Sequence, residues 1–156
     1  MKIRKISTFR WLREEAICVL EKAAKERGIQ IYYTKIPTFI KGNVTLVSEL
    51  VYNLLDNAIK YNKDNGKITV FIGESAKGVE LSVKDTGIGI PPEDTERIFE
   101  RFIALIKATQ KKSRRYRLGT FNSKARLCLH NATIRVKSKV GKGTTIYVTF
   151  PNNVNN

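Results

Sequence analysis

Hydrophobic residues recur at helical spacing in two stretches of the chain, residues 8–27 and 44–62. The apolar positions of the first stretch are Leu12, Ala16, Leu20 and Ala23. Gly28 follows them, where a helix would end in a left-handed cap. The second stretch runs into the turn-like sequence Lys63-Asp-Asn-Gly66. The pattern therefore predicts two amphipathic helices.

Stretches rich in β-branched and aromatic residues, several of them alternating with polar residues, predict five strands. Their ranges are 29–35, 67–73, 78–84, 132–139 and 143–150. Short glycine-containing turns at 76–78 and 140–143 join the last four strands into two hairpins. Two further helices are expected, a short one near 93–102 and another near 120–130.

This order of helices and hairpins, without repeated β-α-β units, predicts an α+β fold. We expect a two-layer α/β sandwich in which a mostly antiparallel, mixed sheet is covered on one face by helices. Nothing in the sequence marks a second domain, so residues 1–151 are predicted to form a single domain. Residues 152–156 are expected to be a disordered tail.

The composition of the 156 residues, 42% hydrophobic and 28% charged, is that of an ordinary soluble globular protein. No apolar run approaches the roughly 20 residues of a membrane span, so no membrane segment is expected in this chain. The basic start lacks the apolar stretch of a signal peptide. Cys18 and Cys128 show no metal-ligand spacing, and the single histidine excludes a His-rich metal site. Together these features favour a reduced, cytosolic protein.

The net charge of +15 is unevenly distributed. Residues 1–100 carry 16 Lys and Arg and all 14 Asp and Glu, whereas residues 101–156 carry 13 Lys and Arg and no acid. Such an excess suggests an anionic partner, such as nucleotide phosphates, nucleic acid, a membrane surface or an acidic protein. A solvated basic surface without a specific partner is an equally good interpretation.

Polar side chains gather on one face of the predicted second helix. At 100° per residue, Glu49, Asn53, Asn57, Lys60 and Tyr61 lie within about 120° of one another, opposite an apolar face. The apolar face carries Val47, Val51, Leu55 and Ala58. Amide oxygens one turn apart can ligate Mg²⁺, a lysine can meet a phosphate, and a tyrosine ring can pack on a base. A polar face that simply meets water is the alternative.

A glycine turn led by a carboxylate, Asp85-Thr-Gly-Ile-Gly-Ile90, follows a predicted strand. Gly87 and Gly89 lack a Cβ, which permits a sharp turn and close approach of a ligand to the backbone. Asp85 could accept a hydrogen bond from an exocyclic amine, the group that distinguishes adenine from guanine. An ordinary strand-to-loop turn would have the same composition.

The two motifs, in this order and about thirty residues apart, resemble the catalytic and ATP-binding domain of sensor histidine kinases. This domain is a branch of the Bergerat-fold (GHKL) ATPases. The matching segments are Asn53–Tyr61 as asparagine box, Asp85–Ile90 as first glycine box, Ile98–Phe102 as phenylalanine box, and Lys139–Ile146 with Phe150-Pro151 as closing hairpin. The similarity extends over nearly the whole chain and implies a Bergerat ATP-binding fold.

The resemblance implies that ATP and Mg²⁺ are the cofactors. It assigns catalysis to Glu49 and Asn53, with Asn53 as metal ligand, and it places a lid at approximately 91–120. The implied nucleotide-binding residues are Asn53, Asn57, Lys60, Tyr61, Asp85, Gly87, Ile88, Gly89, Ile90, Phe102, Leu118, Gly119 and Thr144.

The chain departs from the family where the lid ends. Relatives carry a second glycine box there, and only Gly119 of it remains, because Arg115 and Arg117 replace glycines. Glycines allow backbone N–H groups to cradle phosphate. The two arginines could bind phosphate through their side chains, or they could weaken the site.

The resemblance implies a cytoplasmic domain of a two-component sensor histidine kinase, or of a membrane-bound sensor on its cytoplasmic side. It would bind ATP or ADP and present the γ-phosphate to a histidine on a separate dimerisation domain, and a response regulator would be the further partner. One alternative is a degenerate nucleotide-binding pseudokinase that regulates through protein contacts. Another is an anti-sigma-factor-type serine kinase with Glu49 as base. No specific nucleic acid is expected.

Overall fold

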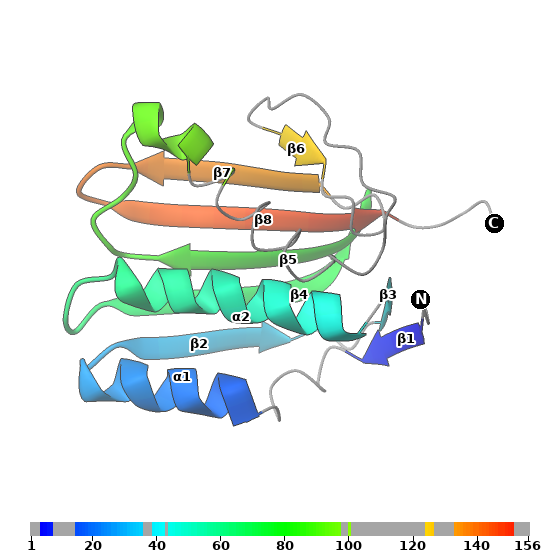
Figure 1. Ribbon diagram of the computed structural model, residues 1–156, viewed down its shortest axis with the longest axis horizontal. Helices are drawn as coiled ribbons and strands as arrows, with labels where there is room; N and C mark the ends of the chain where they lie inside the picture. Colours follow the sequence, from blue (N-terminus) through cyan, green and yellow to red (C-terminus); the bar gives the residue numbers. More distant parts are fainter. Residues whose placement is uncertain are drawn as a thin grey trace.

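The molecule is built on a six-stranded sheet with two helices packed on one of its faces (Figure 1). The computed structural model describes residues 4–7, 15–35, 39–42, 44–97, 100, 124–126 and 133–151. The strands, in their order across the sheet, are β2 (Gln30–Lys35), β4 (Lys67–Ser75), β5 (Gly78–Asp85), β8 (Gly143–Pro151), β7 (Thr133–Lys139) and β6 (Lys124–Arg126). The covering helices are α1 (Glu15–Glu26) and α2 (Val44–Lys60).

All neighbouring strands pair antiparallel except β2 and β4, which run parallel. The predicted hairpins are confirmed as β4–β5 and β7–β8, and the two hairpins join edge to edge through β5 and β8. The α+β sandwich with a mostly antiparallel, mixed sheet is therefore confirmed.

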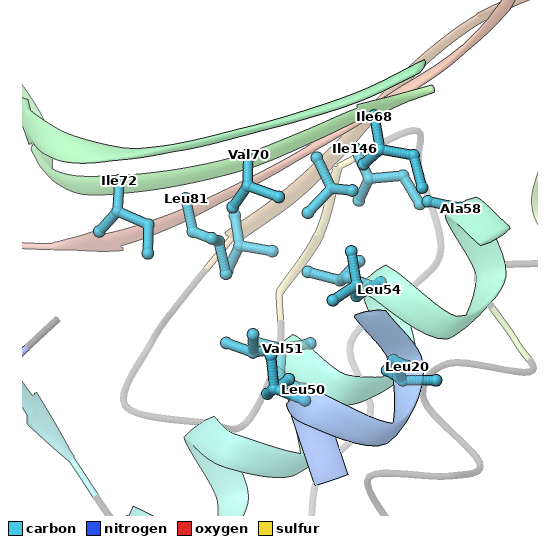
Figure 2. Close-up of a cluster of buried hydrophobic side chains, with 14 of the residues drawn as sticks. Leu20, Leu50, Val51, Leu54, Ala58, Ile68, Val70, Ile72, Leu81 and Ile146 are labelled. Atoms are coloured by element: carbon cyan, nitrogen blue, oxygen red, sulfur yellow. The ribbon is translucent and has the colours of Figure 1, made fainter. Parts of the chain in front are cut away.

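A hydrophobic core fills the space between the sheet and the helices (Figure 2). Leu50 and Leu54 of α2 are fully buried against Ile68, Leu81 and Val148 of the sheet. Along β4 and β5 the inward-facing residues are buried and alternate with more exposed ones, as a sheet covered on one face requires. Burial of such side chains contributes roughly 1.5–3 kcal/mol each and fixes how α2 lies over the sheet.

The first two predicted helices agree with α1 and α2 where the structure describes them. Gly28 follows α1 with a φ of 70°, in the left-handed conformation that favours glycine. The predicted start of this helix, with Leu12, lies outside the described residues. The short helix expected near 93–102 is found at 92–97.

Two expectations differ from the structure. The helix predicted near 120–130 is wrong at 124–126, because these residues form β6 and pair with the outer edge of β7, from Lys124 opposite Arg135 to Arg126 opposite Thr133. A separate two-stranded sheet, β1 (Arg4–Ser7) with β3 (Phe39–Gly42), was not predicted. Within the described part of the chain, no helix is long and apolar enough to cross a membrane.

Candidate functional site

A cavity opens between the C-terminal half of α2 and the sheet. Its lining residues are Leu54, Asn57, Ala58, Tyr61, Val83, Asp85, Ile90, Thr144 and Ile146. Its empty space, including the part open to solvent, is about 370 Å³. Most of the lining is apolar, so the cavity suits a flat ring with a few polar groups at its edge.

Asp85 is the acidic group of this cavity, at the end of β5. Its side chain is on the helix-covered face, and the residue is only 8% exposed. Oδ1 accepts hydrogen bonds from the backbone N–H groups of Gly87, at 2.9 Å, and Thr144, at 3.1 Å. Burial raises the pKa of Asp85, and these two backbone hydrogen bonds act in the opposite direction. For Oδ2, no hydrogen-bond partner is found among the described residues, so this oxygen can accept from a ligand.

The glycine turn after Asp85 is wedged between α2 and the β7–β8 hairpin. A Cβ on Gly87 would lie 2.1 Å from the carbonyl oxygen of Tyr61, and a Cβ on Gly89 would lie 2.2 Å from that of Lys139. Gly89 also has a φ of 75°. The backbone N–H of Ile88 donates to the Tyr61 carbonyl at 3.1 Å. Glycine is thus required at both positions for the turn to approach its neighbours.

Two hydroxyl groups connect the turn to the hairpin. Ser138 and Thr144 lie opposite each other in β7 and β8, and their hydroxyl oxygens are 2.8 Å apart. The backbone N–H of Ile90 donates to the Ser138 hydroxyl at 2.6 Å. Sequence reasoning missed Ser138. The available signal was a polar residue at an inward-facing position of a strand, directly opposite Thr144 in the predicted hairpin.

The polar face of α2 only partly reaches the cavity. Asn57 and Tyr61 line it, whereas Asn53 is half-buried one turn away and is not among the lining residues found in the described chain. Lys60 is exposed and forms an ion pair with Asp56 at 2.9 Å. The hydrogen bond that Lys60 donates to this carboxylate raises the pKa of Lys60.

The other predicted site residues are distributed around the cavity or lie beyond the described chain. Ile90 lines the cavity, whereas Ile88 is 61% exposed and does not. Phe102, Leu118 and Gly119 lie outside the described residues, as does the side chain of Glu49. Four apolar residues that line the cavity were not predicted from the sequence: Leu54, Ala58, Val83 and Ile146.

Candidate metal ligands are amide oxygens rather than a cluster of acids. Among the described residues, no group of three or more His, Cys, Asp or Glu side chains could hold a metal ion. Asn57 at the cavity and Asn53 one turn away offer neutral oxygen ligands. Such a set fits Mg²⁺, which commonly keeps several waters and takes further ligands from substrate phosphates.

Comparisons with known proteins lead to one family. Residues 42–154 match the family described as histidine kinase-, DNA gyrase B-, and HSP90-like ATPase. The chain is 35% identical to the sensor-like histidine kinase SenX3 of Mycobacterium tuberculosis over 139 residues, which are 88% of this chain and 34% of SenX3. It is 36% identical to the sensor histidine kinase WalK of Bacillus subtilis over 107 residues, which are 67% of this chain and 18% of WalK. The chain therefore spans about a third or less of the length of these relatives.

The fold agrees with solved structures. The catalytic domain of histidine kinase ThkA superposes with a TM-score of 0.71 at 18% identity, covering 97% of both chains. A longer ThkA chain, solved in complex with the response regulator protein TrrA, superposes with a TM-score of 0.68 over 96% of this chain and 41% of that one, also at 18% identity.

Proposed function

The chain belongs to the histidine kinase-, DNA gyrase B- and HSP90-like ATPases, as an ATP-binding catalytic domain of the sensor histidine kinase type, and we propose how this domain acts. It binds ATP with Mg²⁺ and presents the γ-phosphate to a histidine on a separate dimerisation domain. The phosphoryl group then passes to a response regulator. The ThkA structure with TrrA supports a partner of that kind, since its kinase chain contains the same fold.

One observation carries this proposal: an apolar cavity whose buried end holds a single carboxylate with one oxygen already occupied. The apolar walls suit an aromatic base, and the Oδ2 atom of Asp85 suits an N–H donor at the edge of that base. Adenine offers such a donor in its exocyclic amine. The backbone bonds to Oδ1 hold the carboxylate in place before the ligand arrives.

The phosphates would extend from the base along α2. Asn57 lies at the cavity and Asn53 lies one turn towards the start of the helix. The two amide oxygens would hold Mg²⁺, which would neutralise charge on the phosphates. Lys60 is exposed and paired with Asp56, so it would contact phosphate only after leaving that partner.

Substitution of Asp85 by asparagine tests the base-binding role. The two N–H donors at Oδ1 would select the amide oxygen for that position, so the amide NH₂ would take the place of Oδ2. A donor would then face the amine of adenine. We expect Asp85→Asn to weaken ATP binding by about 10- to 100-fold in calorimetric titrations with and without Mg²⁺.

Asp64→Asn is the matched control, because Asp64 is exposed and pairs with Arg27 at 3.0 Å. It should leave ATP binding unchanged. The proposed function would be wrong if the native chain did not bind ATP, or if the Asp85→Asn variant bound ATP as tightly as the native chain.

A further inference from the structure

Ser138 is not among the residues that line the cavity, and its hydroxyl group makes three polar contacts, as many as one hydroxyl can satisfy. It receives the backbone N–H of Ile90 at 2.6 Å, it donates to the carbonyl oxygen of Gly143 at 3.2 Å, and it lies 2.8 Å from the hydroxyl of Thr144. A hydroxyl group has one hydrogen to donate and two lone pairs to accept. The three contacts therefore restrict where each hydrogen can be.

One arrangement satisfies all three contacts. Ser138 donates to the Gly143 carbonyl and accepts from both Ile90 N–H and the Thr144 hydroxyl. In the opposite arrangement Ser138 donates to Thr144, and the contact with Gly143 then has no hydrogen. The first arrangement makes one hydrogen bond more in a half-buried position, and it is favoured for that reason.

This arrangement determines the chemistry at the buried end of the cavity. The hydrogen of the Thr144 hydroxyl is used on Ser138, so Thr144 Oγ1 offers only lone pairs to a ligand. The neighbouring Asp85 carboxylate is an acceptor too, and the backbone N–H of Thr144 is already bound to its Oδ1. The end of the cavity formed by Asp85 and Thr144 then presents acceptors rather than donors.

We propose that Ser138 is a specificity-determining residue, which makes Thr144 an acceptor so that the cavity selects a 6-amino purine over a 6-oxo purine. An exocyclic amine has two N–H donors and can satisfy both acceptors. A 6-oxo group would place a third acceptor against them, which is unfavourable because the three acceptors would then face one another without a donor. The inference rests on the proposed function, because it concerns the base of the bound nucleotide.

The test compares the affinities for ATP and inosine triphosphate, which carries a 6-oxo group, in the 156-residue chain. Ser138→Ala releases the hydrogen of Thr144, which can then turn towards the ligand and donate to a 6-oxo group. We expect the affinity ratio of ATP to inosine triphosphate to fall by about 3- to 10-fold. Ser138→Thr keeps the hydroxyl and should retain the native ratio.

Ser75→Ala is the matched control. Ser75 also uses its hydroxyl inside a hairpin, donating to the Gly78 carbonyl at 3.0 Å, but at the end of β5 opposite to Asp85. This variant should leave the ratio unchanged. Thermal unfolding of each variant shows whether a loss of stability accompanies the change.

A double-mutant cycle separates base selection from a purely structural role. Thr144→Val removes the oriented acceptor, so adding Ser138→Ala to it should not change the ratio further. If Ser138→Ala weakened both nucleotides equally and left the ratio unchanged, the inference would be wrong while ATP binding itself stood. If the native chain bound neither nucleotide, both the inference and the proposed function would be wrong.

Discussion

Asp85 and Thr86 are consecutive residues, yet their side chains belong to two polar clusters of opposite character. We name them the Asp85 cluster (Asp85, Ser138 and Thr144) and the Asn62 cluster (Asn62, Thr86 and the backbone of Lys67). Both lie close to the C-terminal end of α2, and Asn62 and Asp85 are both less than 10% exposed. They differ in whether their hydrogen-bonding capacity is used within the protein.

The Asn62 cluster is closed apart from one hydrogen of the Asn62 NH₂ group, for which no partner is found among the described residues. The Asn62 side-chain oxygen accepts from the Lys63 backbone N–H and the Thr86 hydroxyl, and its NH₂ group donates to the Lys67 carbonyl. The Thr86 hydroxyl in turn accepts from the Lys67 backbone N–H at 2.9 Å. The Asp85 cluster leaves Oδ2 of Asp85 and a lone pair of Thr144 to the cavity. Buried polar groups that satisfy one another hold the fold together, whereas those with spare capacity facing a cavity indicate a binding site.

The largest expected effect comes from a substitution that disrupts both clusters at once. A Cβ on Gly143 would lie 2.1 Å from the carbonyl oxygen of Asp85 and 3.0 Å from Cα of Thr86, and the φ of Gly143 is 127°. We expect Gly143→Ala to lower the free energy of unfolding by about 3 kcal/mol or more, because backbone must move and a strained φ remains. Chemical denaturation measures the loss.

Gly141→Ala is the control within the same turn. It has a φ of 82°, but a Cβ there would meet no atom within 4 Å. Only the backbone strain of about 1–2 kcal/mol should appear. Equal losses in the two variants would show that the contact with Asp85 and Thr86 has no effect.

The next prediction distinguishes the roles of the two clusters. Asn62→Ala removes three hydrogen bonds of the closed cluster and leaves backbone groups of Lys63 and Lys67 without these partners. We expect a loss of about 2–3 kcal/mol in the free energy of unfolding. The preference for ATP over inosine triphosphate should persist in the folded protein. A change of that preference without a loss of stability would reverse the roles that we assign to the two clusters.

The pH dependence of stability is a smaller effect that involves the Asp85 cluster alone. Burial raises the pKa of Asp85 above its ordinary value of 3.8 in the folded protein. The folded state therefore binds this proton more tightly than the unfolded state, and the ionised carboxylate destabilises the fold at neutral pH. This penalty disappears as the pH falls from neutral through the raised pKa.

The melting temperatures of the native chain and of the Asp85→Asn variant between pH 7 and pH 4 measure how much the ionised carboxylate destabilises the fold. The native chain should gain stability relative to the variant as the pH falls. Over the same range its ATP affinity should decrease, because a protonated Asp85 loses its charge and carries an O–H donor where the ionised form has an acceptor. A relative loss of stability of the native chain on acidification would contradict the raised pKa.

The smallest effect lies outside both clusters. Lys60→Met removes the exposed ion pair with Asp56. We expect the free energy of unfolding to change by less than about 0.5 kcal/mol, because exposed pairs four residues apart on a helix contribute little. Calorimetry on the same variant measures whether Lys60 takes part in ATP binding, and a several-fold loss of affinity would show that it leaves Asp56 when the nucleotide is bound.

Local patterns predicted most of the fold, because hairpins and amphipathic helices are encoded by neighbouring residues. The Asp85–Ile90 turn and the α2 face, through Asn57 and Tyr61, also led to residues that the structure brings to the cavity. The pairing of β1 with β3 could not be predicted in this way, since these strands have four residues each and lie more than thirty residues apart. β6 was mistaken for a helix because only its pairing with β7 makes it a strand.

The remaining site features depend on cross-strand register rather than on local sequence. Ser138 becomes informative only when β7 is aligned with β8 and the turn after Asp85 is placed against that hairpin. The ion pair of Lys60 could be foreseen in principle, since Asp56 lies four residues before it, but a helical-wheel angle does not show which partner a flexible lysine takes.

The pairing of β5 with β8 has a consequence for how the sequence can change during evolution. These strands bring Asp85 and Thr144 together across the 58 residues that separate them in the sequence. The entropy of closing such a loop grows only with the logarithm of its length, so doubling it costs about 0.6 kcal/mol. Changes of length within this stretch, outside the Asp85–Ile90 turn and strand β7, would therefore cost the fold little, while the two strands that hold the cavity stay in register.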